Sequence, residues 1–259
     1  MPWAQPLAWQ PWVGRTALWK AALWGAVAGT LPDLDVFIDH GDAVRNMVLH
    51  RAETHSLFWL TLFSLPLAAL VARLQGQWAI WKRWWLALWL VLVTHPLLDT
   101  MTVYGTQLAL PFSDHPFGVG SIFIVDPLYT VPLLVGAGWA LAARGSASGL
   151  RANALGLALS TAYLAWGVVA QQRVERIARA SLERQGIAVE QLLVTPAPLN
   201  TVLWRVVALQ GPMYYEGYYS LLDHGRPVRW VAHSRGEDLM QAHAEHPHVK
   251  RMLRFADGF

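Results

Sequence analysis

Charged and imidazole side chains are concentrated between residues 29 and 56, in the stretch GTLPDLDVFIDHGDAVRNMVLHRAETHS. This stretch holds four Asp, one Glu and three His, and it lies between two strongly apolar segments. Charge is costly beside a bilayer, so polar groups placed there usually have a function. We predict that the stretch forms half of a metal site, and that HPLLD (residues 95–99) and Asp126 form the other half.

The spacing of two pairs of residues suits metal binding. His95 and Asp99 are four residues apart, so a helix would place both on one face, where they could share a metal ion. Asp33 and Asp35 follow Pro32 and are two residues apart, so an extended segment would point both the same way. Two close carboxylates repel each other unless a cation lies between them. The alternatives are a His95–Asp99 hydrogen bond that fixes helix packing, and helix capping by one Asp.

Four further residues could complete the site. His50 and His55 are five residues apart, which is a poor helical pair, so the segment breaks or the two contact different ions. Arg51 could hold a phosphate as a bidentate donor, or anchor the chain to lipid headgroups. Asp126 precedes Pro127 in an apolar run and needs a partner there, although a helix N-cap would also explain it.

The complete ligand set is larger than one tetrahedral zinc ion requires. A mixed set of His and carboxylate side chains fits two divalent ions about 3.5–4 Å apart. Ligand softness favours Zn, Mn or Fe over Mg or Ca alone. The predicted metal ligands are Asp33, Asp35, His50, His55, His95, Asp99 and Asp126.

The composition favours a membrane protein. The 259 residues are 54% hydrophobic and include 15 Trp, and only 14% are charged, whereas a soluble domain carries about a quarter charged residues. The net charge of +3 is small and reflects topology better than nucleic-acid binding, so we expect no nucleic-acid partner. The chain has no Cys, which excludes disulfides and thiolate ligands.

The apolar segments predict a mainly α, polytopic membrane helix bundle in residues 1–170. Residues 1–15, rich in Trp and Pro, are predicted to lie at the membrane interface. Residues 171–259 are predicted to form a small α+β domain outside the bilayer, with an amphipathic helix, strand-like runs and a helical tail. The five predicted apolar segments are 16–31, 56–74, 84–103, 121–143 and 151–170.

This segment count places the polar clusters at one face of the membrane. Most basic residues of the membrane part fall on the other face, so the positive-inside rule directs the site away from the cytoplasm. Arg173, Arg176, Arg179 and Arg184 argue against that orientation, but they begin a long domain, where the rule weakens. The basic residues of the opposite face are Arg15, Lys20, Arg73, Lys82, Arg83, Arg144 and Arg151.

Four motifs occur in a fixed order: LPDLD (31–35), HRAETHS (50–56), HPLLD (95–99) and VDP (125–127). In this order they resemble the family of membrane-bound metal-dependent hydrolases that includes the inner membrane protein YdjM. The resemblance continues into residues 195–205 and 214–223. It implies a metal-dependent hydrolase of a bacterial inner membrane, and it implies no substrate. The His/Asp ligand style is also similar to that of zinc-dependent phospholipases C and related nucleases.

Together these features predict a hydrolase at the outer face of the membrane that acts on a phosphoester of a lipid or lipid-linked substrate. Asp35 or Asp126 would be the general base, and Arg51 would steady the phosphate. Membrane lipid is the expected partner, and the oligomeric state stays open. The alternative is a non-enzymatic membrane protein in which the same residues form a structural metal site.

Overall fold

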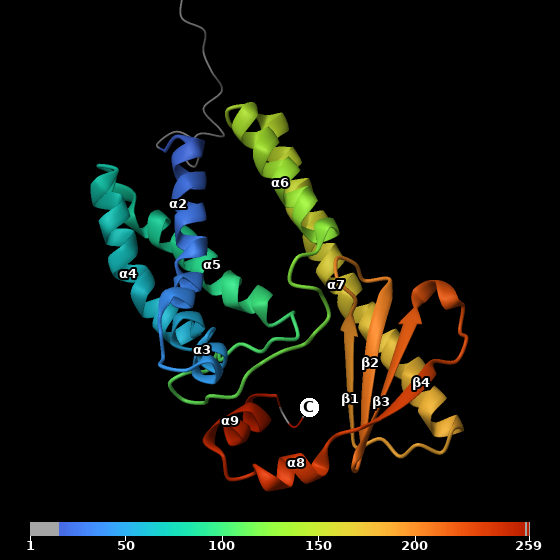
Figure 1. Cartoon of the computed structure of the whole chain (residues 1–259). Coiled ribbons are helices and arrows are strands. Elements are labelled where there is room, and N and C mark those ends of the chain that lie inside the picture. The colour runs from blue at the N-terminus through green and yellow to red at the C-terminus, as the bar shows by residue number, and fades with distance from the viewer. Residues whose placement is uncertain (1–15, 257, 259) are drawn as a thin grey trace, which may run out of the picture.

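The computed structural model describes residues 16–256 and 258. Figure 1 shows a group of helices that includes α2, α4 and α5, a long hairpin of α6 and α7, and a sheet beside the far end of α7. The predicted interfacial segment 1–15 lies outside the described residues.

Short helical elements at one end of the first group carry most of the polar motifs. The core of this group lies between α2, α4 and α5, where Leu88, Leu92 and Val71 are almost fully buried. The elements in chain order are α2 (Leu18–Thr30), the 3-10 helix η1 (Pro32–Phe37), α3 (Ala43–Leu49), η2 (Glu53–His55), α4 (Leu57–Leu74), η3 (Trp78–Ile80) and α5 (Trp81–Asp99).

Local sequence signals fix where these elements begin. Pro32 occupies the first turn of η1, where a missing backbone N–H costs nothing. The side chain of Asp42 caps α3 by accepting from Arg45 N, and Ser56 caps α4 by accepting from Trp59 N. Such caps satisfy backbone donors that a helix start leaves unpaired. The two caps fix the residues at which α3 and α4 begin, and so the positions of η1 and η2 next to them.

Helices α6 (Pro127–Ala142) and α7 (Ala147–Arg184) pack backbone against backbone. A Cβ atom added at Gly136 would lie 2.9 Å from the carbonyl oxygen of Ala152, and one at Gly156 would clash with the carbonyl oxygen of Pro132. Small residues at a helix interface allow this close approach, which is common between helices in membranes.

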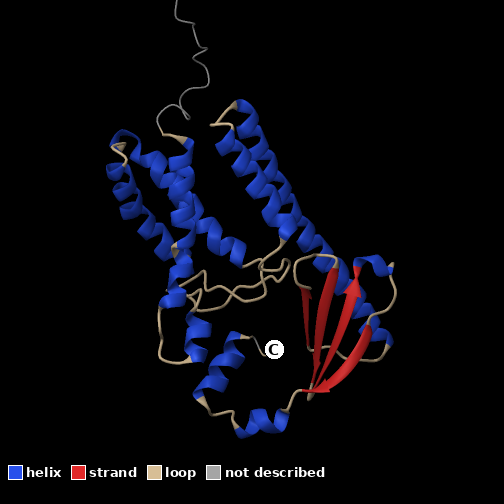
Figure 2. Cartoon of the chain, turned by 45° about the horizontal axis from the view of Figure 1, so that its top comes forward, coloured by secondary structure: helices blue, strands red, loops and turns tan. Residues whose placement is uncertain are grey.

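The C-terminal part contains an antiparallel sheet in the order β1-β2-β3-β4. Its strands are β1 (Gln191–Pro196), β2 (Leu203–Gln210), β3 (Met213–Ser220) and β4 (Arg229–Ser234). The last turns of α7 cover one face, where Val174 and Ala178 pack with Trp204 and Tyr219. After η4 (Leu221–Asp223) and β4, α8 (Glu237–Ala242) and α9 (Pro247–Phe255) lead the chain back to α3, as Figure 2 shows.

The sheet agrees with the strand-like runs that the sequence predicts at residues 201–209, 212–223 and 227–235, whereas β1 was not predicted. The amphipathic helix expected from Gln171 is the continuation of α7, so the predicted boundary between residues 170 and 171 falls inside one helix. The division into a membrane part and an outer domain therefore stays a prediction.

The predicted mainly α bundle of about five membrane spans is wrong. Among residues 16–256 and 258, only α4 and α7 are long and apolar enough to cross a membrane. At 1.5 Å per residue, the 13 residues of α2 and the 16 of α6 fall short of a hydrocarbon core of about 30 Å. Helix α5 is long enough, but Lys82, Arg83, His95 and Asp99 lower its hydropathy.

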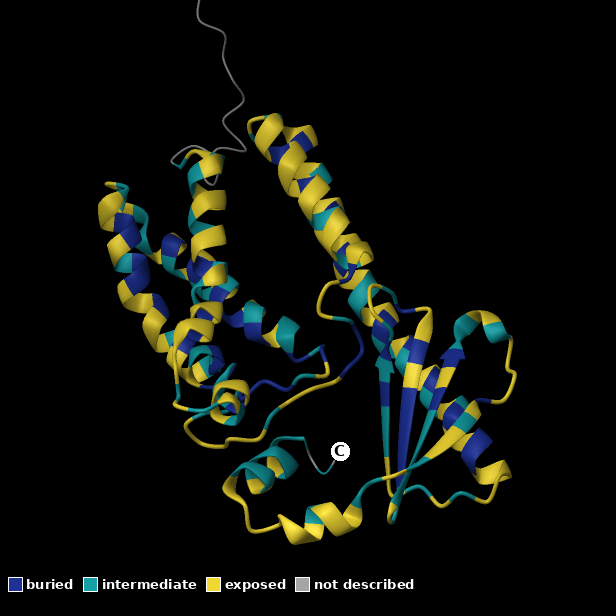
Figure 3. Cartoon of the chain, in the orientation of Figure 1, coloured by how far each residue is buried: buried dark blue, intermediate teal, exposed yellow. Residues whose placement is uncertain are grey.

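The two candidate spans leave much of their apolar surface uncovered. Only 33% of the most apolar window of α4, and 17% of that of α7, is buried inside the molecule, and Figure 3 shows exposed residues on α4 between the buried ones. The core helix of a soluble protein would instead be mostly buried. These exposed apolar helices suggest a membrane location.

A pair of matched substitutions tests the close approach of α6 and α7. We expect Gly156→Ala to destabilise the protein by about 1–3 kcal/mol, because the added methyl forces two backbones apart. In Gly138→Ala the methyl meets no atom within 4 Å, and alanine favours the helix by about 0.5–1 kcal/mol. Thermal unfolding of both variants in one detergent measures the difference, and equal effects of the two would contradict this packing.

Candidate metal centre

Four of the predicted ligands meet at the end of α5. One ligand atom from each of Asp33, His55, His95 and Asp99 lies within 4.8 Å of the others. The Nε2 atom of His55 is 3.4 Å from Asp33 Oδ1, 3.3 Å from Asp99 Oδ2 and 3.3 Å from His95 Nε2. These four residues, called the four-residue cluster below, could hold one metal ion.

Three separate elements supply the four-residue cluster. His95 and Asp99 lie one turn apart on α5, as their spacing predicts for a helix. Asp33 lies in the first turn of η1, and His55 is the last residue of η2. The imidazole of His55 is fully buried, whereas half of the Asp33 side chain is exposed, so the cluster is open to the surroundings on the Asp33 side.

Hydrogen bonds determine which nitrogen of His55 faces the cluster without a proton. The hydroxyl of Thr54 donates to Asp35 Oδ2 at 2.6 Å, so its oxygen can only accept from His55 Nδ1, which is 3.0 Å away. A neutral imidazole with a proton on Nδ1 has a bare lone pair on Nε2. In its neutral form His55 therefore faces the cluster with Nε2 as an acceptor or metal ligand.

Two carboxylates meet the two imidazoles at the centre of the cluster, where His95 Nε2 can donate to the bare His55 Nε2. Asp99 Oδ2 is buried and has no hydrogen-bond partner among the described residues, yet it lies 3.3 Å from the bare His55 Nε2. Lone pairs this close repel each other unless protons or a cation lie between them. A buried acceptor without a partner is costly in a folded protein, and a metal ion would remove that cost.

Asp35 lies beside the cluster and orients two histidines. Its Oδ1 accepts from His50 Nδ1 at 2.8 Å, and its Oδ2 accepts from Thr54 and from the backbone N–H of Arg51. Burial alone would raise the pKa of Asp35, but the hydrogen bonds from Thr54 and Arg51 and the His50 ring outweigh it and hold that pKa below its ordinary value. A carboxylate that orients a metal-binding histidine through its second nitrogen is a recurrent arrangement in metal sites.

His50 lies next to the cluster but outside it. Its ring centre is 6.1 Å from that of His55, and about a quarter of its side chain is exposed. Because Nδ1 bonds to Asp35, Nε2 of His50 is left for another partner. The predicted role of His50 as a ligand stays a prediction, since the four-residue cluster does not include it.

Arg51 is part of the wall of the cluster. Its guanidinium is 3.4 Å from Asp99 Oδ1, donates to Thr102 Oγ1 and lies 5.1 Å from the ring centre of Tyr104. Only 5% of the residue is exposed, and its φ of 65° is uncommon for a residue other than glycine. Arg51 therefore orients Asp99 and places a positive charge beside the cluster.

Asp126 lies away from the cluster, at the start of α6. Its Oδ1 accepts from the backbone N–H of Leu128, and its Oδ2 accepts from the hydroxyl of Tyr163 on α7 at 2.9 Å. These contacts match the N-cap that the sequence left open as an alternative. The structure therefore does not bring Asp126 together with the other predicted ligands.

Tyr104 contributes to the site, and the sequence reading missed it. Its ring contacts His50 edge-on, lies against Arg51, and its hydroxyl donates to the carbonyl oxygen of Met47. Phe255 of α9 contacts the other side of the ring. A single tyrosine in a turn carries no spacing signal, so only the folded chain shows this role.

Comparison with known proteins supports the membrane location. The model of a family described as "YdjM inner membrane protein" matches residues 4–174. A Bacillus subtilis (strain 168) protein described as "Uncharacterized protein YfhP" is 26% identical over 216 residues. That similarity covers 80% of this chain and 63% of the relative, so the chain spans less than two thirds of the length of YfhP.

No solved structure matches the chain. The family description names a location in the inner membrane and names no reaction. The expected hydrolase activity therefore stays a proposal. Because the family model matches more than half of its residues, the chain belongs to the YdjM inner membrane protein family.

Proposed function

We propose that this protein is a metal-dependent hydrolase whose four-residue cluster acts on a phosphoester of a lipid or lipid-linked substrate at the membrane surface. The observation that carries the proposal is the buried, unpartnered Asp99 Oδ2 facing the bare Nε2 of His55. That arrangement suits a cation better than a purely structural network, in which every buried acceptor would have a donor.

The charges and number of ligands suit one divalent ion. Two carboxylates and two neutral imidazoles carry a charge of about −2 and match the four ligands of Zn. Mn and Fe also accept imidazole and carboxylate ligands. We propose one ion at the four-residue cluster in place of the two that the sequence predicted. A second ion would need ligands beyond these four, and Asp35, the nearest candidate, already accepts three hydrogen bonds.

The exposed side of the cluster favours catalysis over a structural metal site. A structural ion is enclosed by its protein ligands, whereas a catalytic ion keeps a position open. Asp33 is half exposed, so a substrate can approach from that side. A divalent ion held here would lower the pKa of a bound water and polarise the phosphoester.

His50 is the proposed proton carrier in this reaction. Its Nδ1 is bonded to Asp35, which orients the ring, as a carboxylate does for a catalytic histidine elsewhere. The ring is adjacent to His55 and partly exposed. His50 would accept a proton from the attacking water and return it to the leaving alcohol.

Asp35 and Arg51 support this arrangement. We propose that Asp35 orients His50 and His55 instead of binding the ion, because its oxygens already accept three hydrogen bonds. Arg51 balances the charge of Asp99 and adds a positive field that favours the approach of an anionic phosphoester. Asp126 caps α6 and accepts a hydrogen bond from Tyr163 of α7. It has no part in the proposed reaction.

The outer face of the membrane remains the proposed location of the cluster. The α4–α5 and α6–α7 turns both lie at the end of the helices opposite α3, on either side of α2 (Figure 1). These two turns and the adjoining helix ends carry Arg73, Lys82, Arg83, Arg144 and Arg151. Basic residues collect on the cytoplasmic side of membrane proteins, so the opposite end would face outward.

Elemental analysis of the purified protein tests the metal site. We expect about one equivalent of Zn, Mn or Fe in gently purified wild-type protein, and its loss in the His95→Ala/Asp99→Ala variant. His243→Ala, which removes an exposed histidine, should keep the ion. A variant that folds and retains its full metal content, or a wild-type protein without metal, would contradict the site. Two equivalents would restore the two-ion prediction.

A second experiment separates proton transfer from metal binding. With chromogenic phosphodiesters as substrates, we expect His50→Ala to lower kcat by about 10²–10⁴-fold while the metal content stays at the wild-type level. The pH dependence of the residual activity should lose its acidic limb, because the titrating base is gone. If His50→Ala instead loses the ion, His50 is a ligand, as the sequence predicted, and the proposed proton carrier is wrong.

A further inference from the structure

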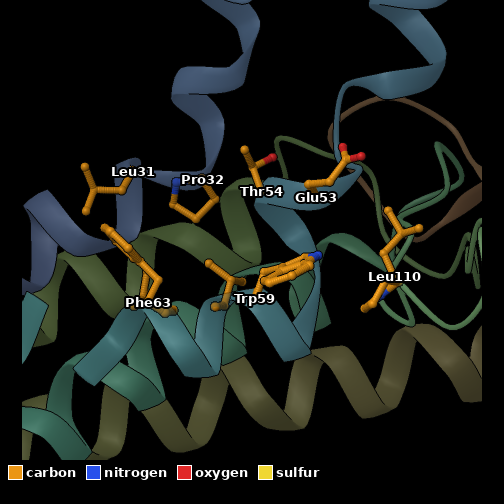
Figure 4. Close-up of a pocket in the computed structure, with 10 residues that line it drawn as sticks. Leu31, Pro32, Glu53, Thr54, Trp59, Phe63 and Leu110 are labelled. Atoms are coloured by element: carbon orange, nitrogen blue, oxygen red, sulfur yellow. The ribbon is translucent and has the colours of Figure 1, made fainter. Parts of the chain in front are cut away.

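An apolar pocket of about 510 Å³ opens beside the four-residue cluster. Its volume falls in the range of pockets that bind small molecules, about 300–1,000 Å³. Figure 4 shows Trp59 and Phe63 along one side and Glu53 and Thr54 on the opposite side. The metal centre described above does not use this pocket.

The pocket and the cluster share their walls. Three residues that line the pocket are near neighbours of metal-type ligands along η1, η2 and α5. Pro32 directly precedes Asp33, and Thr54 directly precedes His55. Leu92 lies three residues before His95, so both point from one face of α5. The pocket therefore lies next to the cluster on the same three elements, although none of the four ligands lines it.

The outer side of the pocket continues into the exposed face of α4. Trp59 is 42% exposed and Phe63 is 47% exposed, and both line the pocket. Helix α4 is one of the two candidate membrane spans, so this face would contact lipid chains. A hydrocarbon chain could pass from the bilayer into the pocket without crossing water.

The charges determine which end of a lipid enters. The lining is apolar apart from Glu53 and Thr54, and an anionic phosphate would meet repulsion from the Glu53 carboxylate there. Arg51 and the proposed cation give the opposite field at the cluster. A phospholipid or phosphorylated alcohol would thus lie with its chain in the pocket and its phosphate at the cluster.

We propose that this pocket binds the hydrocarbon chain of a single lipid substrate and places its phosphoester at the four-residue cluster. This inference rests on the proposed function for the identity of the headgroup. The length of the pocket limits how many carbons of the chain add to the binding affinity, because carbons beyond the pocket gain no further burial.

Binding of alkylphosphonates of increasing chain length to the protein in amphipol tests this proposal. Each methylene that enters the pocket should tighten Kd about fourfold, until the pocket is full and Kd becomes constant. Phe63→Trp should bring that plateau to a shorter chain, and Phe63→Ala should move it to a longer one. Leu65→Trp, at an exposed position of α4 outside the pocket, should leave it unchanged.

The same series distinguishes failure of the pocket from failure of the proposed function. Affinity that is independent of chain length, or that rises without a plateau equally in all variants, would overturn the pocket. A plateau that persists in the His95→Ala/Asp99→Ala variant, in a protein that hydrolyses no phosphoester, would support the pocket and remove the hydrolase. Hydrolysis of soluble phosphoesters without any chain preference would support the proposed hydrolase and contradict the pocket.

Discussion

The hydrogen bond from Thr54 to Asp35 is the contact on which the rest of the site depends. It leaves the Thr54 oxygen as an acceptor for His55 Nδ1, and so turns a bare Nε2 toward Asp33, His95 and Asp99. The same carboxylate also binds His50 and the backbone of Arg51. The buried Asp35 thus helps to orient η2, and it determines which nitrogen of His55 is free to bind a metal ion.

The surrounding fold fixes the positions of the residues of the site. Capped short helices set the positions of η1 and η2, and the buried contacts of α2, α4 and α5 hold the end of α5 beside them. From the other side, Phe255 of α9 contacts Tyr104, which in turn lies against Arg51 and His50. The C-terminal part therefore supports the site through the contacts of α9, although it supplies none of the four residues of the cluster.

Helix α4 belongs both to the proposed site and to a candidate membrane span. Its start carries the Ser56 cap beside η2, and Trp59 and Phe63 are exposed along it. A substrate that leaves the bilayer at this face would meet the pocket first and the four-residue cluster second. Helix α7 joins a candidate membrane span to the sheet, because its first half exposes apolar residues and its last turns cover the strands.

The sequence alone determined features that depend on neighbouring residues: the pairing of His95 with Asp99 on a helix and the strands β2 to β4. It offered the cap at Asp126 only as an alternative to a ligand role. It did not determine the separation of Asp33 from Asp35, because these residues form a 3-10 helix instead of an extended segment. Successive residues of a 3-10 helix differ in direction by about 120°, so one carboxylate joins the cluster and the other turns to Thr54 and His50. The isolation of Asp126 and the role of Tyr104 were decided by the tertiary structure, since both depend on distant segments that no local spacing records. The number of candidate spans depends on where each helix begins and ends.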